Sequence, residues 1–410
     1  MRRVACLLLF AFAFTIPWQY SLDLGEPLGN AARMAGVLTL LAAVPALFQT
    51  GRVRRPSAFG WITLALYLWF CTACFWSIDL TASLMKLRAY FQECMIVWLV
   101  WEFAETPADL RNLVRAAVAG SWVLALLTLA AFRSPEAMAA GQIRFAAYGQ
   151  DPNDMARFLD LGLPLAALLA RCERGWAMRL LGFGFLPVGI IAVLLTASRS
   201  GFLAALAALA GSLVILARGR ARSMTAVAFA LPAFLAALWF IVPGATLARL
   251  ATIPRQLAGG SLNERVNIWT MGWEAFVRNP IAGSGAGSFV AAAHTAPFDT
   301  AHNAALMILV EGGLCALFLA SLLAVLAVRA ALRTRGPLRT ALLTCLLVLA
   351  IGSLTATLEE NRVTWLIFAL TILAARLSEE DPQGVAACFR FAPSQPVRKH
   401  SGSLAAEGSS

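Results

Sequence analysis

The amino-acid sequence predicts an all-α protein that crosses a membrane about twelve times, and three observations lead to this prediction. Hydrophobic residues make up 60% of the chain, charged residues only 13%, and the mean hydropathy is +0.74. In soluble globular proteins about a quarter of the residues are charged. Apolar stretches of about twenty residues, the length that crosses a hydrocarbon core, recur along the chain. Arginines fill alternate connections between them, as the positive-inside rule requires of cytoplasmic loops.

The first apolar stretch follows Arg2 and Arg3 and ends near Trp18. It is similar to a signal peptide, but Gln19 and Tyr20 stand where the small residues of a cleavage site would be. We therefore expect a retained first helix. Eleven further spans are predicted at 31–48, 58–76, 87–103, 113–132, 154–170, 178–196, 200–217, 223–243, 303–328, 338–356 and 363–377.

The charge alternation gives the predicted orientation. Each connection assigned to the cytoplasm carries arginines, from Arg52 in the first to Arg339 in the last. We expect a transmembrane domain over 1–377, with both termini in the cytoplasm of a bacterial inner membrane. The loop 244–302 would face the periplasm, and the Pro-, Gly- and Ser-containing tail over 378–410 would be disordered. The other outer connections are 19–30, 77–86, 133–153, 197–199 and 357–362.

Composition also disfavours several functions. The net charge of +11 would suggest an acidic partner for a soluble protein, but here the arginines set orientation, so nucleic-acid binding is not expected. The eight cysteines lie in apolar spans or on the cytoplasmic side and are interpreted as reduced apolar residues. Cys71 and Cys74 form a CxxC inside a span, without a second pair or a nearby histidine. We expect no metal and no cofactor.

Arginines also occur on the outer side, where orientation does not call for them. They are Arg144, Arg157, Arg199, Arg249, Arg255, Arg265, Arg278 and Arg362. Arg157 lies inside a span with Asp160 three residues later, so it either faces a wet cavity or forms a structural ion pair. Arg199 lies at the mouth of the following helix, which Ser198 or Ser200 is placed to cap.

The start of the span at 154–170 carries a possible carboxylate pair. Asp151 and Asp154 would suit a metal ion, but with Pro152 between them they fit the N-cap, N1 and N3 positions of a helix better. A helix that begins at this face also directs backbone amides and the positive end of its dipole outward. Such a helix end can bind an anion.

Within the long outer loop, residues 265–278 have the apolar spacing of an amphipathic helix that lies on the membrane surface or caps a cavity. The glycines at 283–287 predict a tight turn rather than a phosphate loop, because no lysine follows them. His302 begins the next span, with Asn303 beside it. A helix N-terminus disfavours imidazolium, which suits a general base. A histidine bonded to a loop carbonyl at the membrane interface is the alternative.

Four segments together resemble the O-antigen ligase and polymerase superfamily of bacterial envelope glycan assembly. They are RFAAYGQDPNDMA (144–156), SRSGF (198–202), ERVNIWTMGWEAFVRNPIAGSGAGSF (264–289) and AHNAALMILVEGGL (301–314). Their order and spacing extend the likeness over residues 1–377. Asp151 stands where the family usually has asparagine, which keeps the capping role.

The resemblance implies a glycosyltransferase that moves a glycan from undecaprenyl diphosphate to an acceptor without nucleotide or metal. It implies that His302 is the catalytic base and that Arg144, Arg199 and Arg265 hold the diphosphate. Planar guanidinium groups suit paired phosphate oxygens. The expected site therefore has His302 and Arg144 as catalytic residues, and Arg199, Arg265, Arg157 and Asn303 as diphosphate ligands.

The acceptor stays open at this point. Lipid A-core would make the protein a ligase, a growing glycan would make it a polymerase, and a protein acceptor would make it an O-glycosylating relative. A transporter is a less favoured alternative, because its polar residues would lie near the bilayer midplane between related repeats, and no repeat is visible. The predicted partners are the carrier-linked glycan, the acceptor and membrane lipid.

Overall fold

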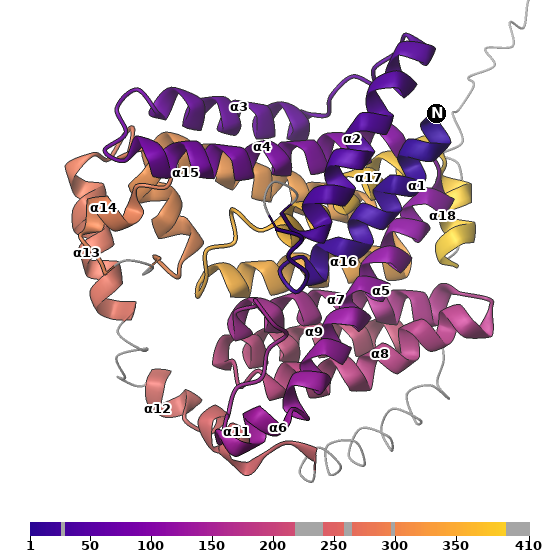
Figure 1. The fold of residues 1–410 in the computed structure, drawn as a ribbon. Helices are drawn as coiled ribbons and strands as arrows, with labels where there is room; N and C mark the ends of the chain where they lie inside the picture. The colour runs from indigo at the N-terminus through magenta and orange to yellow at the C-terminus, as the bar shows by residue number, and fades with distance from the viewer. Residues whose placement is uncertain (26–28, 218–240, 258–264, 297–299, 391–410) are drawn as a thin grey trace, which may run out of the picture.

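The computed structural model describes residues 1–25, 29–217, 241–257, 265–296 and 300–390. Over these ranges the regular structure is helical, apart from one isolated bridge between Asp23 and Asn30. The predicted all-α class is therefore confirmed. Most of the long helices lie side by side, and their ends gather at two opposite ends of the bundle (Figure 1).

Eleven of the predicted spans correspond to helices. These are α1 (Arg2–Thr15), α2 (Ala31–Thr50), α3 (Ala58–Ala73), α4 (Leu80–Phe103), α5 (Pro107–Phe132), α7 (Pro152–Cys172), α8 (Trp176–Leu195), α9 (Arg199–Ala217), α15 (Ala304–Arg333), α16 (Gly336–Ser353) and α17 (Arg362–Glu380). Six of them, α2, α5, α8, α9, α15 and α16, are long and apolar enough to cross a membrane. The span predicted at 223–243 falls almost wholly outside the described residues. Twelve crossings therefore remain a prediction.

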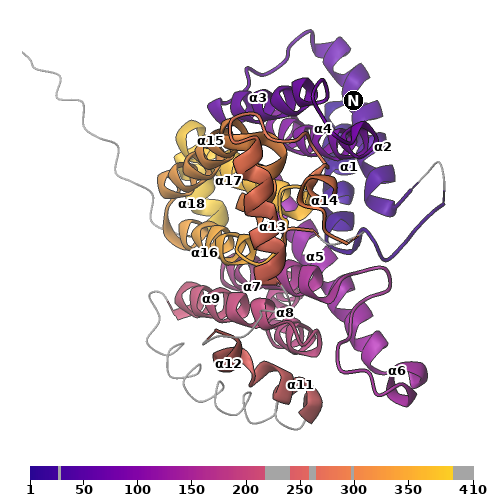
Figure 2. The same cartoon turned by 90° about the vertical axis from the view of Figure 1, so that its left-hand side faces the viewer.

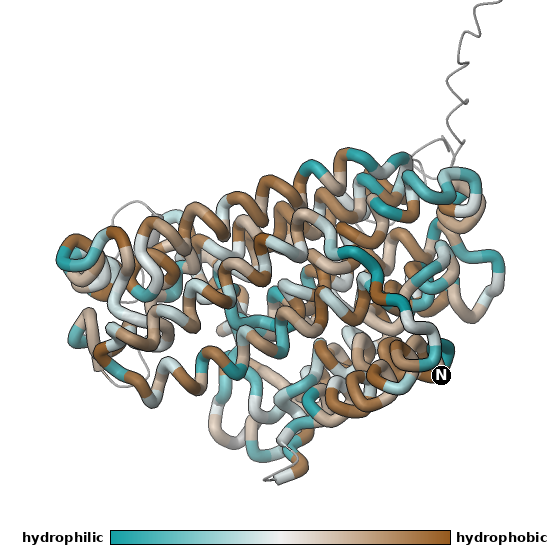
Figure 3. The backbone as a smooth tube through the Cα atoms, turned by 90° about the horizontal axis from the view of Figure 1, so that it is seen from above, coloured by the Kyte–Doolittle hydropathy of each residue, from teal (hydrophilic) through white to brown (hydrophobic). Residues whose placement is uncertain are grey.

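Position in the bundle explains why some helices are less apolar than a lipid-facing span. α7 packs against α5, α8, α9 and α16 and is buried along nearly its whole length. A helix enclosed by protein does not need an apolar surface all round, and it tolerates Asp154, Arg157 and Asp160. α17 is enclosed in the same way. Figure 3 shows long hydrophobic stretches along the helices, with hydrophilic residues concentrated toward the ends of the bundle.

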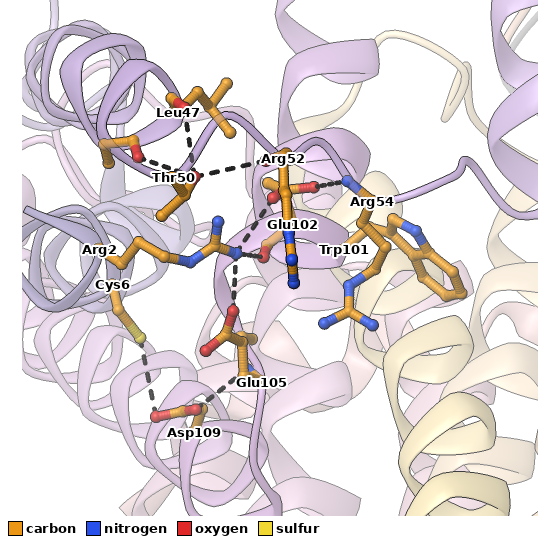
Figure 4. Close-up of polar contacts among 12 residues, drawn as sticks. Arg2, Cys6, Leu47, Thr50, Arg52, Arg54, Trp101, Glu102, Glu105 and Asp109 are labelled. Carbon is orange, nitrogen blue, oxygen red and sulfur yellow. Dashed lines mark hydrogen bonds and ion pairs between the residues drawn. The ribbon is translucent and has the colours of Figure 1, made fainter.

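Ion pairs join the segments at one end of the bundle (Figure 4). Arg2 Nη2 lies 3.0 Å from Glu102 Oε1 and 2.7 Å from Glu105 Oε1. The backbone N–H of Arg54 donates to Glu102 Oε2 at 2.8 Å. Arg376 of α17 donates to the carbonyl of Trp101 at 2.6 Å. The start of α1, the α2–α3 connection and the ends of α4 and α17 therefore lie together, and all four were predicted on one side.

The predicted outer connections meet at the other end. Arg362 donates to the side chains of Gln19 and Gln92, and Ile78 N–H donates to Ser284 O at 3.2 Å. Seen from this end, α13 (Arg265–Arg278) crosses in front of the helix ends (Figure 2). These contacts agree with the predicted grouping of the connections. Which end faces the periplasm stays a prediction.

The long outer loop contains more helix than the sequence predicted. Besides α13 it forms α11 (Gly244–Leu250), α12 (Ile253–Leu257) and α14 (Phe289–Ala293), and the short α6 (Pro135–Ala139) precedes α7. The predicted amphipathic helix is present as α13. It buries Ile268 and Phe276 with residues of α14 and α15, whereas Trp273 and Val277 are exposed.

The ordered chain extends past the predicted tail boundary at 378. α17 ends at Glu380, and α18 (Pro382–Phe389) follows. Asp381 caps α18 by accepting from Gly384 N–H at 2.8 Å, and Val385 and Phe389 are buried against the bundle. This cap and the two apolar side chains hold a segment that we expected to be disordered. Residues 391–410 lie outside the described residues.

Candidate functional site

The start of α7 is built by a local cap, as predicted. The carboxylate of Asp151 accepts from the N–H groups of Asn153 at 2.8 Å and Asp154 at 3.2 Å, and Pro152 occupies N1. The partner of Arg157 differs from the expected one. Its guanidinium pairs with Asp154, three residues earlier, rather than with Asp160. Only 2% of Arg157 is exposed, so this arginine forms a buried structural pair at the base of the helix start.

Asn153 joins the starts of α7 and α9. Its Oδ1 accepts from Arg144 Nη2 at 2.9 Å and from Ser198 Oγ at 2.9 Å. Ser198 Oγ in turn accepts from Gly201 N–H at 3.1 Å and so caps α9, and Arg144 Nε donates to Thr196 O at 3.3 Å. Sequence reasoning gave Asn153 no role, although it stands between the two capping aspartates. The only signal for Asn153 in the sequence was its position inside the helix-capping motif that starts at Asp151.

Arg249 is a second residue that the sequence left without a role. Arg249 Nε donates to Ala197 O at 3.2 Å, and Arg199 Nε donates to Arg249 O at 3.5 Å. These two bonds tie α11 to the start of α9. Arg249 was one of the outer arginines, but nothing in its local sequence separated it from Arg255.

The arginines lie close enough to influence one another electrostatically. Burial lowers the pKa of Arg144; Asp151 opposes this, and Arg265 and Arg199 lower the pKa further. Burial lowers the pKa of Arg249 as well, and Arg144 and Arg199 add to that effect. Burial also lowers the pKa of Arg265, and the nearby carboxylate of Asp151 partly offsets this by raising it. Guanidinium groups remain charged after shifts of this kind, so the region attracts anions.

His302 is connected to this region through α13. Arg265 and Trp269 are four residues apart and therefore share a face of that helix. Trp269 Nε1 donates to Ala301 O, the carbonyl just before His302, at 2.8 Å. His302 itself has a φ of 46°, a conformation that costs energy for a residue with a Cβ. Asn303 Oδ1 accepts from Leu306 N–H at 3.0 Å and caps α15, so it has a structural role beside the predicted one.

The other histidine and arginines of the predicted outer side are either exposed or bonded to other parts of the fold. His294 is exposed at the end of α14. Arg278 donates to Ala292 O at 2.6 Å, and Arg362 serves the contacts to Gln19 and Gln92. Arg255 is exposed on α12. Hydrogen bonds thus link the segments that carry Arg144, Arg199 and Arg249, and Arg265 lies close enough to lower the pKa of Arg144. We call these four residues the arginine cluster.

The helix after His302 is broken at Gly313, where φ is 66° and ψ is −166°. The glycine turn at 283–287 pairs with this break: Ser284 N–H donates to Val310 O at 2.8 Å and Gly285 N–H to Glu311 O at 2.9 Å. On the far side of the break, Leu314 N–H donates to Pro280 O at 2.9 Å. The prediction of a tight turn is confirmed by the positive φ values of Gly283, Gly285 and Gly287.

Lys86 of α4 anchors the same break and was not predicted as part of the site. Its Nζ lies 2.6 Å from Glu311, 2.6 Å from Glu360 and 3.4 Å from Glu359. Burial raises the pKa of Glu359, in the α16–α17 connection, to about 7; Lys86 opposes this rise. The signal in the sequence was that Lys86 is the only lysine before the tail. Its three partners come from two distant segments, so the sequence alone did not reveal them.

An apolar cavity of about 300 Å³ adjoins this network. It begins at Ala304, two residues after His302, and continues along α15 to Val328, with α16 and α17 on its other sides. Its lining is almost entirely apolar, apart from polar groups such as Glu359 and Tyr90.

Fold and site together define a multi-pass helical membrane protein with a cationic site at one end of the bundle. Residues 184–321 match the family model Wzy_C, described as O-Antigen ligase. The matched segment runs from α8 into α15 and includes Arg199, Arg249, Arg265 and His302. For this part of the chain, the match confirms the resemblance seen in the sequence. No curated protein matches the chain.

Proposed function

We propose that the protein is an O-antigen ligase-type glycosyltransferase that moves a glycan from undecaprenyl diphosphate to lipid A-core at the periplasmic face of the inner membrane. The observation that carries the proposal is the arginine cluster. It gathers side chains from the α6–α7 connection and from α9, α11 and α13 within a segment order typical of the family. A site of this charge suits a diphosphate better than a neutral transported solute.

The negative charge of the donor's diphosphate leaving group accounts for the presence of several arginines at the proposed site. A diphosphate carries about two negative charges, and these guanidinium groups are partly buried, so each contact is stronger than it would be in bulk water. Negative charge builds on the bridging oxygen as the glycosidic bond breaks. Arg144, Arg199 and Arg265 would stabilise that charge, the task that a divalent metal performs in many other enzymes. Arg249 joins them in this proposal.

His302 would act as the general base. Its imidazole nitrogen takes the proton of an acceptor hydroxyl, whose oxygen attacks the anomeric carbon as the bond from that carbon to the diphosphate oxygen breaks. The products are the glycosylated acceptor, with inverted anomeric configuration, and undecaprenyl diphosphate. The anchoring of His302 between Trp269 and the cap at Asn303 supports this role, because a base must be held within hydrogen-bond reach of its proton.

The apolar cavity along α15 supports a lipid-linked substrate. It starts beside His302 and has the lining that a hydrocarbon chain requires. A polyprenyl chain in this cavity would bring its diphosphate to the same end of the bundle as the arginine cluster.

Deletion of the gene, followed by gel analysis of surface polysaccharide, tests the proposal. A ligase predicts uncapped lipid A-core and accumulated long carrier-linked glycan. Lipid A-core capped by a single repeat would instead indicate a polymerase, and loss of glycan from a protein would indicate an O-glycosylating relative. Unchanged polysaccharide and carrier pools would contradict all three. The wild-type gene should restore the normal pattern, and so should a variant with Arg255→Lys.

A purified assay tests the chemistry separately. The full-length protein should transfer glycan from the carrier to lipid A-core in the presence of a chelator, because the arginines supply the positive charge. Strict dependence on an added divalent metal would overturn this mechanism.

A further inference from the structure

A second cavity, of about 440 Å³, lies at the opposite end of α7 from the arginine cluster. α7 has 21 residues, which gives a helix of about 30 Å, close to the thickness of a hydrocarbon core. The cavity is therefore level with the other membrane boundary. Its lining comes from three segments and consists of Arg111, Arg115, Cys172, Glu173, Arg174, Gly175, Ala387, Cys388 and Arg390.

Positive charge exceeds negative charge in this lining. Glu173 is the only acidic residue among the lining residues, and Arg115 binds both of its carboxylate oxygens at 2.7 Å. This pair leaves Arg111, Arg174 and Arg390 without a carboxylate in the cavity wall. Arg111 Nε is shielded from solvent and has no hydrogen-bond partner among the described atoms. A buried guanidinium donor without an acceptor is costly and calls for an anion.

Membrane orientation alone does not account for this arrangement. Arginines that only set orientation can stand on exposed connections, as Arg52 and Arg55 do. Here α18 closes the cavity, because Phe389 O accepts from Cys172 Sγ at 3.1 Å and brings Arg390 to the ends of α5 and α7. The following residues, 391–410, contain two basic residues and a single glutamate. The net charge of their side chains is therefore positive and does not offset that of the cavity.

We propose that this cavity binds the phosphate of an anionic phospholipid headgroup. Arginine is suited to this ligand because its planar fork donates to two phosphate oxygens at once. Basic pockets between membrane helices at the boundary of the bilayer bind such headgroups. The site is separate from the glycosyl-transfer site and does not depend on its assignment.

Lipid retention by the purified full-length protein tests the proposal. The protein in detergent is titrated with phosphatidylglycerol, with cardiolipin and with neutral phosphatidylcholine, and bound lipid is counted by native mass spectrometry. Each arginine near a membrane surface contributes about 1 kcal/mol, or about fivefold in affinity. Arg111→Gln with Arg174→Gln should therefore weaken binding of the anionic lipids by about twenty-five-fold. Arg115 is left intact, because it holds Glu173.

Arg52→Gln with Arg55→Gln is the matched control, since it removes the same charge from the same end of the bundle. The proposal expects this control to bind anionic lipid like the wild type. Equal losses in both double variants would show general surface attraction and overturn the proposal, and so would equal retention of phosphatidylcholine. Binding of millimolar inorganic phosphate, with no anionic lipid retained even when phosphate is absent, would overturn the lipid assignment in favour of a soluble phosphate.

Discussion

His302 and His294 lie in the same outer loop region but have different surroundings. His302 is partly buried and lies between the Trp269–Ala301 hydrogen bond and the cap of α15. His294 is exposed at the end of a five-residue helix. Both histidines have a positive φ, so backbone strain does not separate them, and the difference lies in burial and anchoring. These observations favour His302 as the residue that touches the acceptor.

We therefore expect His302→Ala to lose about a hundred- to ten-thousand-fold of transfer rate, the usual contribution of a general base. His294→Ala should keep most of the activity. The wild-type rate should fall in acid, because an imidazolium has no lone pair to accept the proton. A transfer assay of both variants across pH checks this. Near-normal activity of His302→Ala would rule out the proposed base.

A second prediction separates forked arginine contacts from simple charge. Arg144→Lys and Arg265→Lys keep the charge but lose paired donation to phosphate oxygens, so transfer should fall at least tenfold for each. Arg255→Lys, on the exposed surface of α12, is the control and should stay close to the wild type. Initial rates at several donor concentrations, with protein levels matched by immunoblot, give the comparison. Normal rates for both cluster variants would reassign the diphosphate to other arginines.

Glu359 gives a prediction for stability. In the unfolded chain its carboxyl ionises near the ordinary value of 4.5, whereas burial raises the folded-state pKa to about 7. Between these values the folded protein binds more protons, so the free energy of unfolding should fall as pH rises. Glu359→Gln should flatten this dependence, while the more exposed Glu360→Gln should reduce it less, because Glu360 only adds to the rise in the pKa of Glu359. Thermal unfolding from pH 5 to 8 measures both. An unchanged slope in Glu359→Gln would contradict the prediction.

At the scale of elements, the break in α15 separates the segment that follows His302 from the membrane-crossing part of the helix. The first segment, residues 304–312, is held by the glycine turn at 283–287, by Lys86 and by Trp69, whose Nε1 donates to Gly312 O at 2.9 Å. These contacts come from α3, α4 and the outer loop. The position of His302 therefore depends on packing as well as on its own cap.

Gly313 is the residue that permits this break. A Cβ at Gly313 would lie 2.1 Å from Ile281 O, and the backbone there has a positive φ. Gly313→Ala should therefore lower stability by several kcal/mol and reduce transfer, because φ strain of about 1 kcal/mol is joined by a backbone clash. Gly51→Ala is a matched control, since Gly51 also has a positive φ but nothing within 4 Å of the added Cβ. Thermal unfolding and transfer assays compare them. Equal losses would mean that φ strain alone accounts for the effect.

Local signals in the sequence predicted the features that are built locally. The cap at Asp151, the cap at Ser198 and the amphipathic helix α13 each depend on residues within one turn. The break in α15 required contacts with the glycine turn about thirty residues away, as counted along the chain. Lys86 found partners in α15 and the α16–α17 connection. Contacts that depend on tertiary packing could therefore not be predicted from the sequence. The pairing of Arg157 with Asp154 rather than Asp160 is another example.

At the scale of the whole molecule, arginines lie at both ends of the bundle but have different companions. At the end that holds Arg2 and Arg54 they meet Glu102, Glu105 and Glu380. In the arginine cluster they meet the amide of Asn153 and backbone carbonyls. Asp151 is the acidic residue that acts on Arg144 and Arg265, and it raises the pKa of both. The neutral companions of the cluster support the proposal that it binds an anionic donor.

The orientation of these two ends gives the last prediction. Inner arginines such as Arg52 and Arg339 outnumber the acidic residues of their connections, which favours retention of these connections in the cytoplasm. A periplasm-only reporter fused after Gly260 should therefore be active, and the same reporter after Ser401 should be silent. A cytoplasm-only reporter at the two positions should give the opposite pattern, which controls for expression. Activity of the periplasmic reporter after both Gly260 and Ser401 would require an even number of crossings between them, where three are predicted. It would place the arginine cluster and the tail on the same side of the membrane, contrary to the proposed site.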